Sequence, residues 1–207
     1  MDRQTLIDTI RRKQSFLCVG LDPDLARMPA HLGTGPEAVL AFNRALIEAT
    51  SDLAVAYKPN VAFYETLGAE GWDILQQTME AIPEGCLRIA DAKRGDIGNT
   101  ATRYAQAAFE AWNADAVTVA PYMGRDSVEP FLAFEDKWTI LLAATSNPGA
   151  EDFEFHGAEG GQPLWRRVLE VSSTYAGADR LMYVVGATRP DWFCLLYTSD
   201  AADDRSC

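Results

Sequence analysis

The residues best suited to acid–base chemistry lie in one short segment, residues 90–100, which reads ADAKRGDIGNT. In an extended chain, residues two apart point to the same face, so Asp91 and Lys93 should project together. Asp96 lies beyond a glycine turn and can be aimed elsewhere. A lysine beside carboxylates stays protonated, which suits Lys93 to donate a proton rather than to attack as a nucleophile. The alternative is a surface salt-bridge loop, which accounts for most D-x-K spacings, but this segment directly follows an apolar run that predicts a buried strand.

Other catalytic chemistries find little support in the sequence. The two histidines, His31 and His156, lie in segments containing Gly or Pro and have no partner nearby, which disfavours a zinc site or a Ser-His-Asp hydrolase. The four cysteines are too few for a disulfide framework and lack metal-ligand spacing. No G-x-G-x-x-G or Walker loop follows the first predicted strand, which disfavours a dinucleotide fold. The chemistry must therefore use Asp, Lys, Ser and Thr side chains.

Composition limits the class of protein further. The 207 residues include 18 Lys and Arg against 30 Asp and Glu, and the net charge of −12 makes non-specific nucleic-acid binding a poor hypothesis. Hydrophobic residues make up 48% of the chain and charged residues 23%, as in a globular protein with one sizeable core. The longest apolar runs fall far short of the roughly 20 residues that span a bilayer, and the N-terminus has no signal-peptide core. We expect a cytoplasmic protein that binds neither nucleic acid nor membrane.

The elements that must position the segment 90–100 follow from an alternating pattern along the chain. Continuous apolar runs predict six strands, at residues 15–21, 53–57, 86–90, 116–120, 139–144 and 181–185. Helical spacing predicts helices at residues 5–13, 37–49, 63–81 with interruptions at Gly68 and Gly71, 99–112, 127–134 and 164–175. Apolar strands separated by helices predict a parallel sheet, because each crossover has room for a helix. The predicted fold class is therefore α/β.

The positions of polar residues favour one α/β architecture. Nearly every predicted strand ends in a polar residue or cluster: Asp22, Lys58, Asp91 with Lys93, Tyr122, Thr145 with Ser146, and Thr188. An active site assembled from many strand ends is typical of a (β/α)₈ TIM barrel, whereas an open sheet concentrates such residues at one switch point. A barrel needs about 250 residues, and six strands already occupy about 190. We therefore expect only about the first six βα units to be present.

The segment from Asp91 to Thr100 resembles the D-x-K-x-x-D-I-x-x-T signature of orotidine 5′-phosphate decarboxylases. Five more strand-end segments resemble those of the second subfamily: GLDPD at 20–24, YKPN at 57–60, APYMG at 120–124, TSNPG at 145–149 and VGATRP at 185–190. The matches follow one another in the right order over residues 15–190. The resemblance implies a cofactor-free, metal-free lyase that converts orotidine 5′-monophosphate to UMP and CO₂ in pyrimidine biosynthesis, as a homodimeric barrel.

The resemblance also implies residue roles. Asp22 and Lys58 would hold the ribose hydroxyls, and Asp91 and Lys93 would face the scissile carboxylate and C6 of the pyrimidine. Residues that would reach across the dimer interface into the partner's site are Asp96, Ile97 and Thr100, and the residue that would hydrogen-bond the base is Ser146. Two alternatives stay open, because a strand-end lysine can be a structural ion-pair partner and Ser-Asn-Pro-Gly is also ordinary turn chemistry.

Three competing interpretations remain. A sugar-phosphate decarboxylase or aldolase of the same barrel superfamily shares the D-x-K-x-x-D cluster but uses Mg²⁺; the segments 97–100 and 57–60 favour the pyrimidine enzyme. The others are an inactive fragment and a pseudoenzyme that acts as an interaction module. The resemblance stops at about residues 191–193, and the string from Cys194 resembles a translated sequencing adapter. We therefore expect a C-terminally truncated barrel domain over residues 1–193 and a non-native tail over 194–207.

Overall fold

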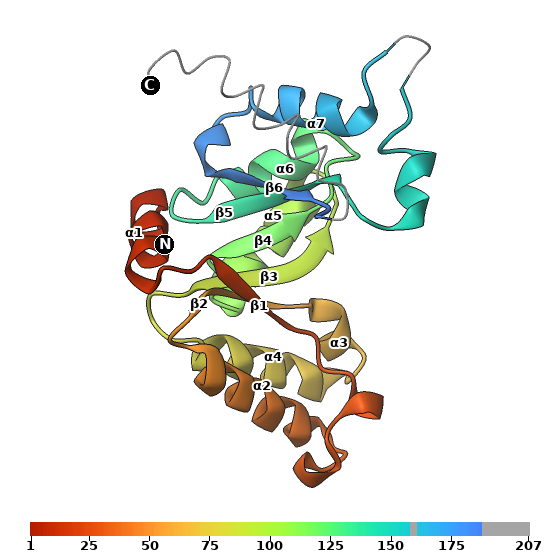
Figure 1. Cartoon of the computed structure of the whole chain (residues 1–207). Coiled ribbons are helices and arrows are strands. Elements are labelled where there is room, and N and C mark those ends of the chain that lie inside the picture. Colours follow the sequence, from red (N-terminus) through yellow and green to blue (C-terminus); the bar gives the residue numbers. More distant parts are fainter. Residues whose placement is uncertain (158–160, 188–207) are drawn as a thin grey trace.

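Six parallel strands lie side by side in the order in which they occur along the chain (Figure 1). The computed structural model describes residues 1–157 and 161–187. Its strands are β1 (Leu17–Leu21), β2 (Ala54–Pro59), β3 (Leu87–Arg94), β4 (Ala116–Val119), β5 (Trp138–Ala144) and β6 (Leu181–Val185). Every pair of neighbours is parallel, as the alternating pattern predicted. The predicted domain boundary at residue 193, the tail 194–207 and the strand-end residue Thr188 lie outside the described residues.

Helices lie before the first strand and between the strands, and those between the strands cover one face of the sheet (Figure 1). They are α1 (Arg3–Lys13), α2 (Pro36–Thr50), α3 (Val61–Glu65), α4 (Ala69–Ala81), α5 (Gly98–Gln106), α6 (Arg125–Leu132) and α7 (Leu164–Ser172), with 3₁₀ turns η1 (Leu25–Arg27), η2 (Ala30–Leu32), η4 (Pro148–Asp152) and η5 (Ala178–Arg180) and a π-helical turn η3 (Ala107–Ala111). Local chemistry sets several starts: the Asp2 carboxylate caps α1 by accepting from the Thr5 N–H, and Pro36 occupies the first turn of α2. No helix in the described ranges is both long and apolar enough to cross a membrane.

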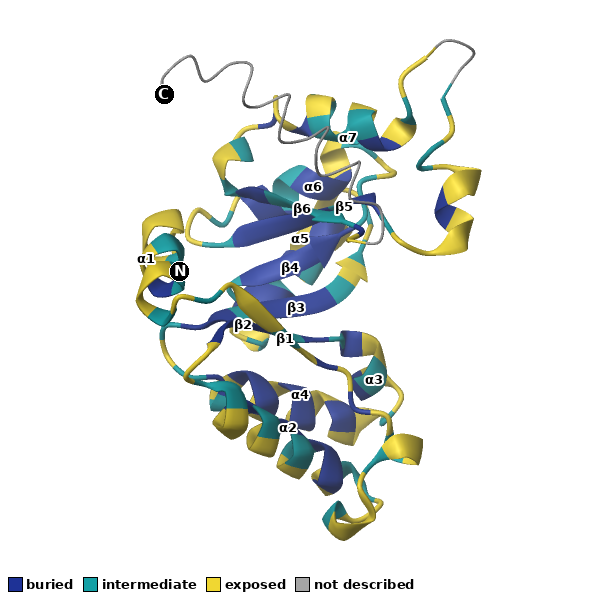
Figure 2. Cartoon of the chain, in the orientation of Figure 1, coloured by how far each residue is buried: buried dark blue, intermediate teal, exposed yellow. Residues whose placement is uncertain are grey.

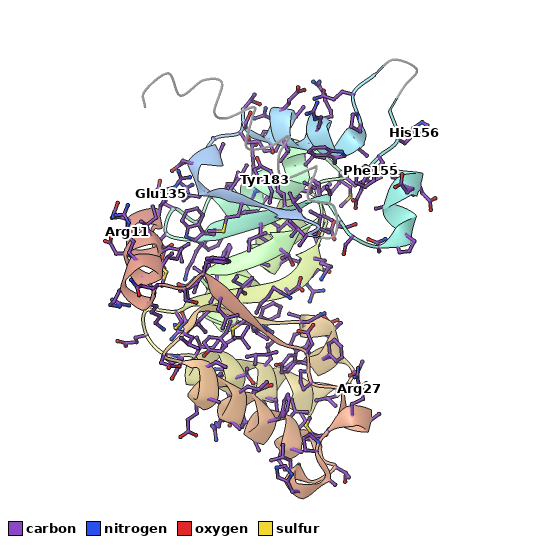
Figure 3. The ribbon with its side chains drawn as sticks, in the orientation of Figure 1. Arg11, Arg27, Glu135, Phe155, His156 and Tyr183 are labelled. Atoms are coloured by element: carbon purple, nitrogen blue, oxygen red, sulfur yellow. The ribbon has the colours of Figure 1, made fainter. Side chains whose placement is uncertain are left out.

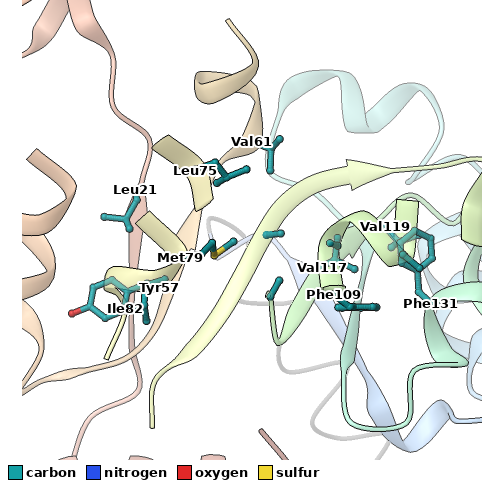
Figure 4. Close-up of a cluster of buried hydrophobic side chains, with 14 of the residues drawn as sticks. Leu21, Tyr57, Val61, Leu75, Met79, Ile82, Phe109, Val117, Val119 and Phe131 are labelled. Carbon is teal, nitrogen blue, oxygen red and sulfur yellow. The ribbon is translucent and has the colours of Figure 1, made fainter. Parts of the chain in front are cut away.

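The sheet is apolar on both faces. Its helix-facing side forms the larger core, in which Leu21 and Tyr57 lie near Leu75, and Phe109 meets Phe131 edge to face with ring centroids 6.4 Å apart (Figure 4). A second, smaller cluster is formed by Val55, Ala56, Leu87, Ile89, Ala116, Trp138 and Ile140, with Met1 and Ile10 packed against it. The central strands are buried, whereas β1 is largely exposed (Figure 2). Burial on both faces is the reason the strand sequences are continuous apolar runs.

The sheet curls into part of a barrel. Helices α2 and α4 lie beyond one end of the strand series and α6 and α7 near the other, so the strands turn progressively between them (Figure 1). The six strands match the prediction of a TIM-barrel fold in which six βα units are present. Because each strand is parallel to the next, the carboxyl ends of all six meet at one edge, where an active site of this fold is assembled.

Two predicted helices, over 63–81 and 99–112, are not continuous α-helices in the structure. The interruption expected at Gly68 is confirmed, since Gly68 lies between α3 and α4 with a φ of 67°. Gly71 does not interrupt α4: it lies inside the helix, where a Cβ atom would stand 1.8 Å from the Tyr64 carbonyl oxygen. The helix expected over 99–112 changes from α-helical to π-helical hydrogen bonding at Ala107.

Candidate active site

The polar end of β3 supplies the main chemical groups of the site. β3 continues to Arg94, four residues beyond the predicted end, and its register with β4 shifts between Ala90 and Arg94. The Lys93 and Asp91 side chains meet, since Lys93 Nζ donates to Asp91 Oδ1 at 2.7 Å. The expected reason, a regular extended chain, was wrong: Lys93 has a φ of 47°, in the left-handed region that side-chain-bearing residues seldom adopt.

The Asp91 carboxylate is the centre of a hydrogen-bond network. Only 7% of the residue is exposed, and its two oxygens accept three hydrogen bonds. Lys58 Nζ on β2 donates to Oδ2 at 2.8 Å, while Lys93 Nζ and the Thr118 hydroxyl on β4 donate to Oδ1 at 2.7 and 2.9 Å. Three neighbouring strands therefore converge on one carboxylate.

The charges in this network stabilise one another. Burial by itself raises the pKa of the Asp91 carboxyl, but the hydrogen bonds and charges of Lys58 and Lys93 outweigh it, so the pKa lies below its ordinary value. Burial lowers the pKa of the Lys58 ammonium, but the hydrogen bond and attraction of Asp91, with a further contribution from Asp22, raise it above its ordinary value. At neutral pH Asp91 is an anion and Lys58 a cation.

Asp22 lies directly after β1 and is exposed. With Arg27 and Phe42 it lines a hollow of about 220 Å³, and Figure 3 shows Arg27 on the 3₁₀ turn that follows the strand. Asp22 directly follows Leu21, which pairs with Pro59 next to Lys58, so the two predicted ribose ligands lie at the neighbouring carboxyl ends of β1 and β2.

Of the three residues expected to act in a partner's site, Asp96 and Ile97 lie just before α5 and Thr100 lies in its first turn. The Asp96 carboxylate accepts from the Ile97 N–H at 2.8 Å, and Ile97 is 53% exposed although it is apolar. Thr100 is exposed in the first turn of the helix. Within the described part of the chain, none of them hydrogen-bonds to the Asp91 carboxylate.

Ser146 is exposed in the turn that follows β5. Glu154 anchors this turn, since its carboxylate accepts from the Thr145 N–H at 2.6 Å and from the Thr145 hydroxyl at 2.8 Å. A Cβ atom on Gly186, just after β6, would lie 3.0 Å from the Ser146 Cβ. The same loop borders a largely apolar pocket of about 540 Å³, whose lining includes Tyr122, Leu142, Phe153 and Trp165. Beyond the pocket lining, the loop continues to Phe155 and His156 (Figure 3).

Two residues of this region were missed by reasoning from sequence. Thr118 is 2% exposed in a strand that reads AVTV, where the single hydroxyl was the available signal. Arg94 follows Lys93 and pairs with Glu65 at 2.7 Å, while its guanidinium lies over the Tyr104 ring at 5.1 Å. In residues 1–157 and 161–187, no three His, Cys, Asp or Glu side chains are grouped as metal ligands.

A parallel α/β sheet curled toward a barrel, with a lysine–carboxylate–lysine network at the carboxyl ends of its strands, is the architecture of a TIM-barrel enzyme. Comparison with known proteins identifies which one. The model of the "Orotidine 5'-phosphate decarboxylase / HUMPS family" matches residues 15–191. The chain belongs to this family, and its relatives named orotidine 5′-phosphate decarboxylase are carboxy-lyases.

Individual relatives agree with this assignment. The chain is 56% identical over 196 residues to orotidine 5′-phosphate decarboxylase of Flavobacterium johnsoniae, a match that covers 93% of this chain and 71% of the relative. It is 51% identical to that of Bacteroides fragilis, over 91% of this chain and 70% of the relative. Among solved structures, Leishmania donovani OMP decarboxylase superposes with a TM-score of 0.83 at 39% identity, over 93% of this chain and 75% of the other.

Proposed function

We propose that the site around Asp91 converts orotidine 5′-monophosphate to UMP and CO₂ in pyrimidine biosynthesis, without a metal or an organic cofactor. One observation carries the proposal: the Lys93 ammonium lies 2.7 Å from Asp91 Oδ1, at the strand-end edge, in a chain 56% identical to a protein named as such a decarboxylase. The Mg²⁺-dependent sugar-phosphate alternative is not favoured by these relatives.

The reaction needs positive charge and then a proton at one carbon atom. When the bond from C6 to the carboxyl carbon breaks, CO₂ leaves and the electron pair stays on C6, where no conjugated carbonyl accepts it. A preorganised ammonium stabilises this charge in the transition state. Lys93 Nζ then transfers a proton to C6, the new C6–H bond completes UMP, and the neutral amine regains a proton from water.

Asp91 has two roles in this proposal. Its carboxylate holds the Lys93 ammonium in place through the 2.7 Å contact. It also lies beside the position of the substrate carboxylate, where like-charge repulsion is relieved as neutral CO₂ departs. Buried among its three hydrogen-bond donors, Asp91 stays ionised and can exert both effects.

The remaining polar residues would hold the nucleotide. Lys58 and Asp22, at the neighbouring carboxyl ends of β2 and β1, would bind the ribose hydroxyls. Exposed Ser146 would hydrogen-bond the base. The exposed start of α5 would place Asp96, Ile97 and Thr100 in the site of a second subunit, which makes the active form a homodimer, and we place this soluble enzyme in the cytoplasm.

Turnover in the presence of a chelator tests this function. The 207-residue chain is incubated with orotidine 5′-monophosphate in excess EDTA, and UMP is measured by chromatography. A parallel reaction contains a β-keto sugar-phosphate acid with Mg²⁺. We expect UMP formation at the same rate with and without EDTA. Absence of UMP, or turnover of the sugar phosphate that depends on Mg²⁺, would overturn the proposal.

A further inference from the structure

Thr118 connects the two groups on which the proposed chemistry depends. The residue lies in β4, next to β3 in the sheet, and only 2% of it is exposed. Its hydroxyl oxygen is 2.9 Å from the backbone nitrogen of Lys93 and 2.9 Å from Asp91 Oδ1. It is thus in contact with both residues and almost wholly buried.

The direction of these two hydrogen bonds follows from the groups involved. A hydroxyl has one proton to donate and lone pairs with which to accept. The Lys93 backbone N–H can only donate, so the Thr118 oxygen accepts that bond and its own proton goes to Asp91. An ionised carboxylate can only accept, so this arrangement stabilises the ionised form of Asp91.

The backbone of Lys93 explains why this acceptor is needed. Its φ of 47° lies in the left-handed region, where the chain leaves the regular strand path. The ladder between β3 and β4 shifts its register between Ala90 and Arg94, and regular pairing resumes where the Ala120 N–H donates to the Arg94 carbonyl at 2.8 Å. The Thr118 hydroxyl takes the place of a ladder carbonyl for the Lys93 N–H within the irregular stretch.

We propose that Thr118 is a positioning residue for the decarboxylation: its hydroxyl fixes the Lys93 backbone in the left-handed conformation and the Asp91 carboxylate in its ionised orientation. This inference rests on the proposed function, in which Lys93 delivers the proton to C6. Thr118 does not touch the substrate and acts through the two residues that it joins. Removing its hydroxyl should misplace the ammonium without removing any substrate ligand.

The test compares Thr118→Val with Thr118→Ser and with a matched control. Valine keeps the shape of threonine but removes the hydroxyl, whereas serine keeps the hydroxyl. Thr139→Val is the control, because Thr139 is fully buried on the adjacent strand β5 and its hydroxyl has no hydrogen-bond partner among the described residues. We expect Thr118→Val to lower kcat about 10- to 100-fold, the loss that corresponds to one hydrogen bond to a charged group, with KM changed less than about threefold.

The remaining kinetic results separate positioning from mere folding. Thr118→Ser should recover most of kcat, and Thr139→Val should stay within about twofold of the unsubstituted chain. The acid limb of the kcat/KM profile should move to higher pH in Thr118→Val, since the Asp91 anion loses a donor. Native kcat in Thr118→Val, a loss confined to KM, or an equal loss in Thr139→Val would overturn the inference.

Two NMR measurements test the structural part of the inference, that Thr118 holds Lys93 and Asp91, without relying on enzyme activity. In Thr118→Val the Lys93 amide proton should exchange with solvent faster, and the ¹³C titration of the Asp91 carboxyl should move to higher pH. Unchanged exchange and titration would overturn the inference even where kcat falls. Failure of the unsubstituted chain to form UMP would instead overturn the proposed function, and the two NMR signals would still show whether Thr118 holds Lys93 and Asp91.

Discussion

Replacing Asp91 by Asn removes the one negative charge that holds two ammonium groups together. The Asp91 side chain is 9% exposed, whereas those of Lys58 and Lys93 are 33% and 50% exposed. Removing one partner of a fully buried ion pair costs about 3–5 kcal/mol, and an exposed pair contributes about 0–1 kcal/mol. Since both lysines can turn partly toward water, we expect Asp91→Asn to lower the free energy of unfolding by an intermediate amount, about 2 kcal/mol at pH 7.

Urea denaturation followed by tryptophan fluorescence measures this loss. For a slope of about 2 kcal/mol per molar urea, the midpoint should fall by about 1 M. Glu129→Gln is the matched control, because Glu129 makes a 2.8 Å pair with Arg125 on the surface of α6, where the two side chains are 37% and 49% exposed. The same acid-to-amide change there should cost less than about 0.5 kcal/mol.

The pH dependence of the loss identifies its electrostatic origin. The pKa of Asp91 is lowered on folding, so its contribution to stability is present above the unfolded value of about 3.9 and is lost as the pH falls through the folded pKa. The difference in unfolding free energy between the chain and Asp91→Asn should therefore be constant above about pH 5 and should shrink below about pH 4. Equal losses in the two variants, or an Asp91→Asn effect that does not change with pH, would refute this reasoning.

Three further predictions concern the shared site, a glycine and a buried phenol. Mixing inactive Lys93→Ala subunits with inactive Asp96→Ala subunits should restore UMP formation through hybrid dimers, and no recovery despite demonstrated subunit exchange would contradict a site built from two subunits. Gly71→Ala should lower the free energy of unfolding in urea by about 2–3 kcal/mol, because the new Cβ meets the backbone carbonyl of Tyr64 at 1.8 Å. The control Gly149→Ala, whose new Cβ has its nearest contact at 3.4 Å, should change that free energy by less than about 0.5 kcal/mol. Equal effects of the two substitutions would contradict the packing argument. Tyr64→Phe should cost about 1–2 kcal/mol in the same assay, since the hydroxyl accepts from Asn43 and donates to the Leu21 carbonyl, and an unchanged midpoint would contradict it.

Much of the fold could be predicted because a strand that is buried on both faces is a continuous run of apolar residues. The run 181–185 and the helix opened by Pro36 lie where the apolar pattern placed them. The end of β3 could not be predicted in the same way, because Asp91, Lys93 and Arg94 are charged and such residues are typical of a loop. The burial of Gly71 against the Tyr64 carbonyl is a tertiary contact, so the glycine looked like a helix breaker.

The same distinction applies to the candidate site, where sequence spacing predicts some contacts and the packing of strands determines the others. The proximity of Asp91 and Lys93 followed from their spacing, but the positive φ at Lys93 depends on the neighbouring strand. Thr118 escaped detection because the atoms that it joins lie 25 and 27 positions away in sequence, and its own strand is otherwise apolar. Residue type and spacing therefore predict which groups do chemistry, whereas the groups that hold them come from the packing of strands.

The central claim is that Lys93 supplies the charge and the proton at C6, and its removal tests that claim most directly. The rate of UMP formation is measured for Lys93→Ala and for the control Lys137→Ala. Lys137 lies just before β5, at the amino end of that strand, whereas the site lies at the carboxyl ends of the strands. Loss of the proton donor and of its charge should lower kcat by at least about 10⁴-fold in Lys93→Ala, with circular dichroism and thermal midpoint close to those of the unsubstituted chain, while Lys137→Ala keeps native turnover. Near-native kcat in a folded Lys93→Ala variant would contradict the account.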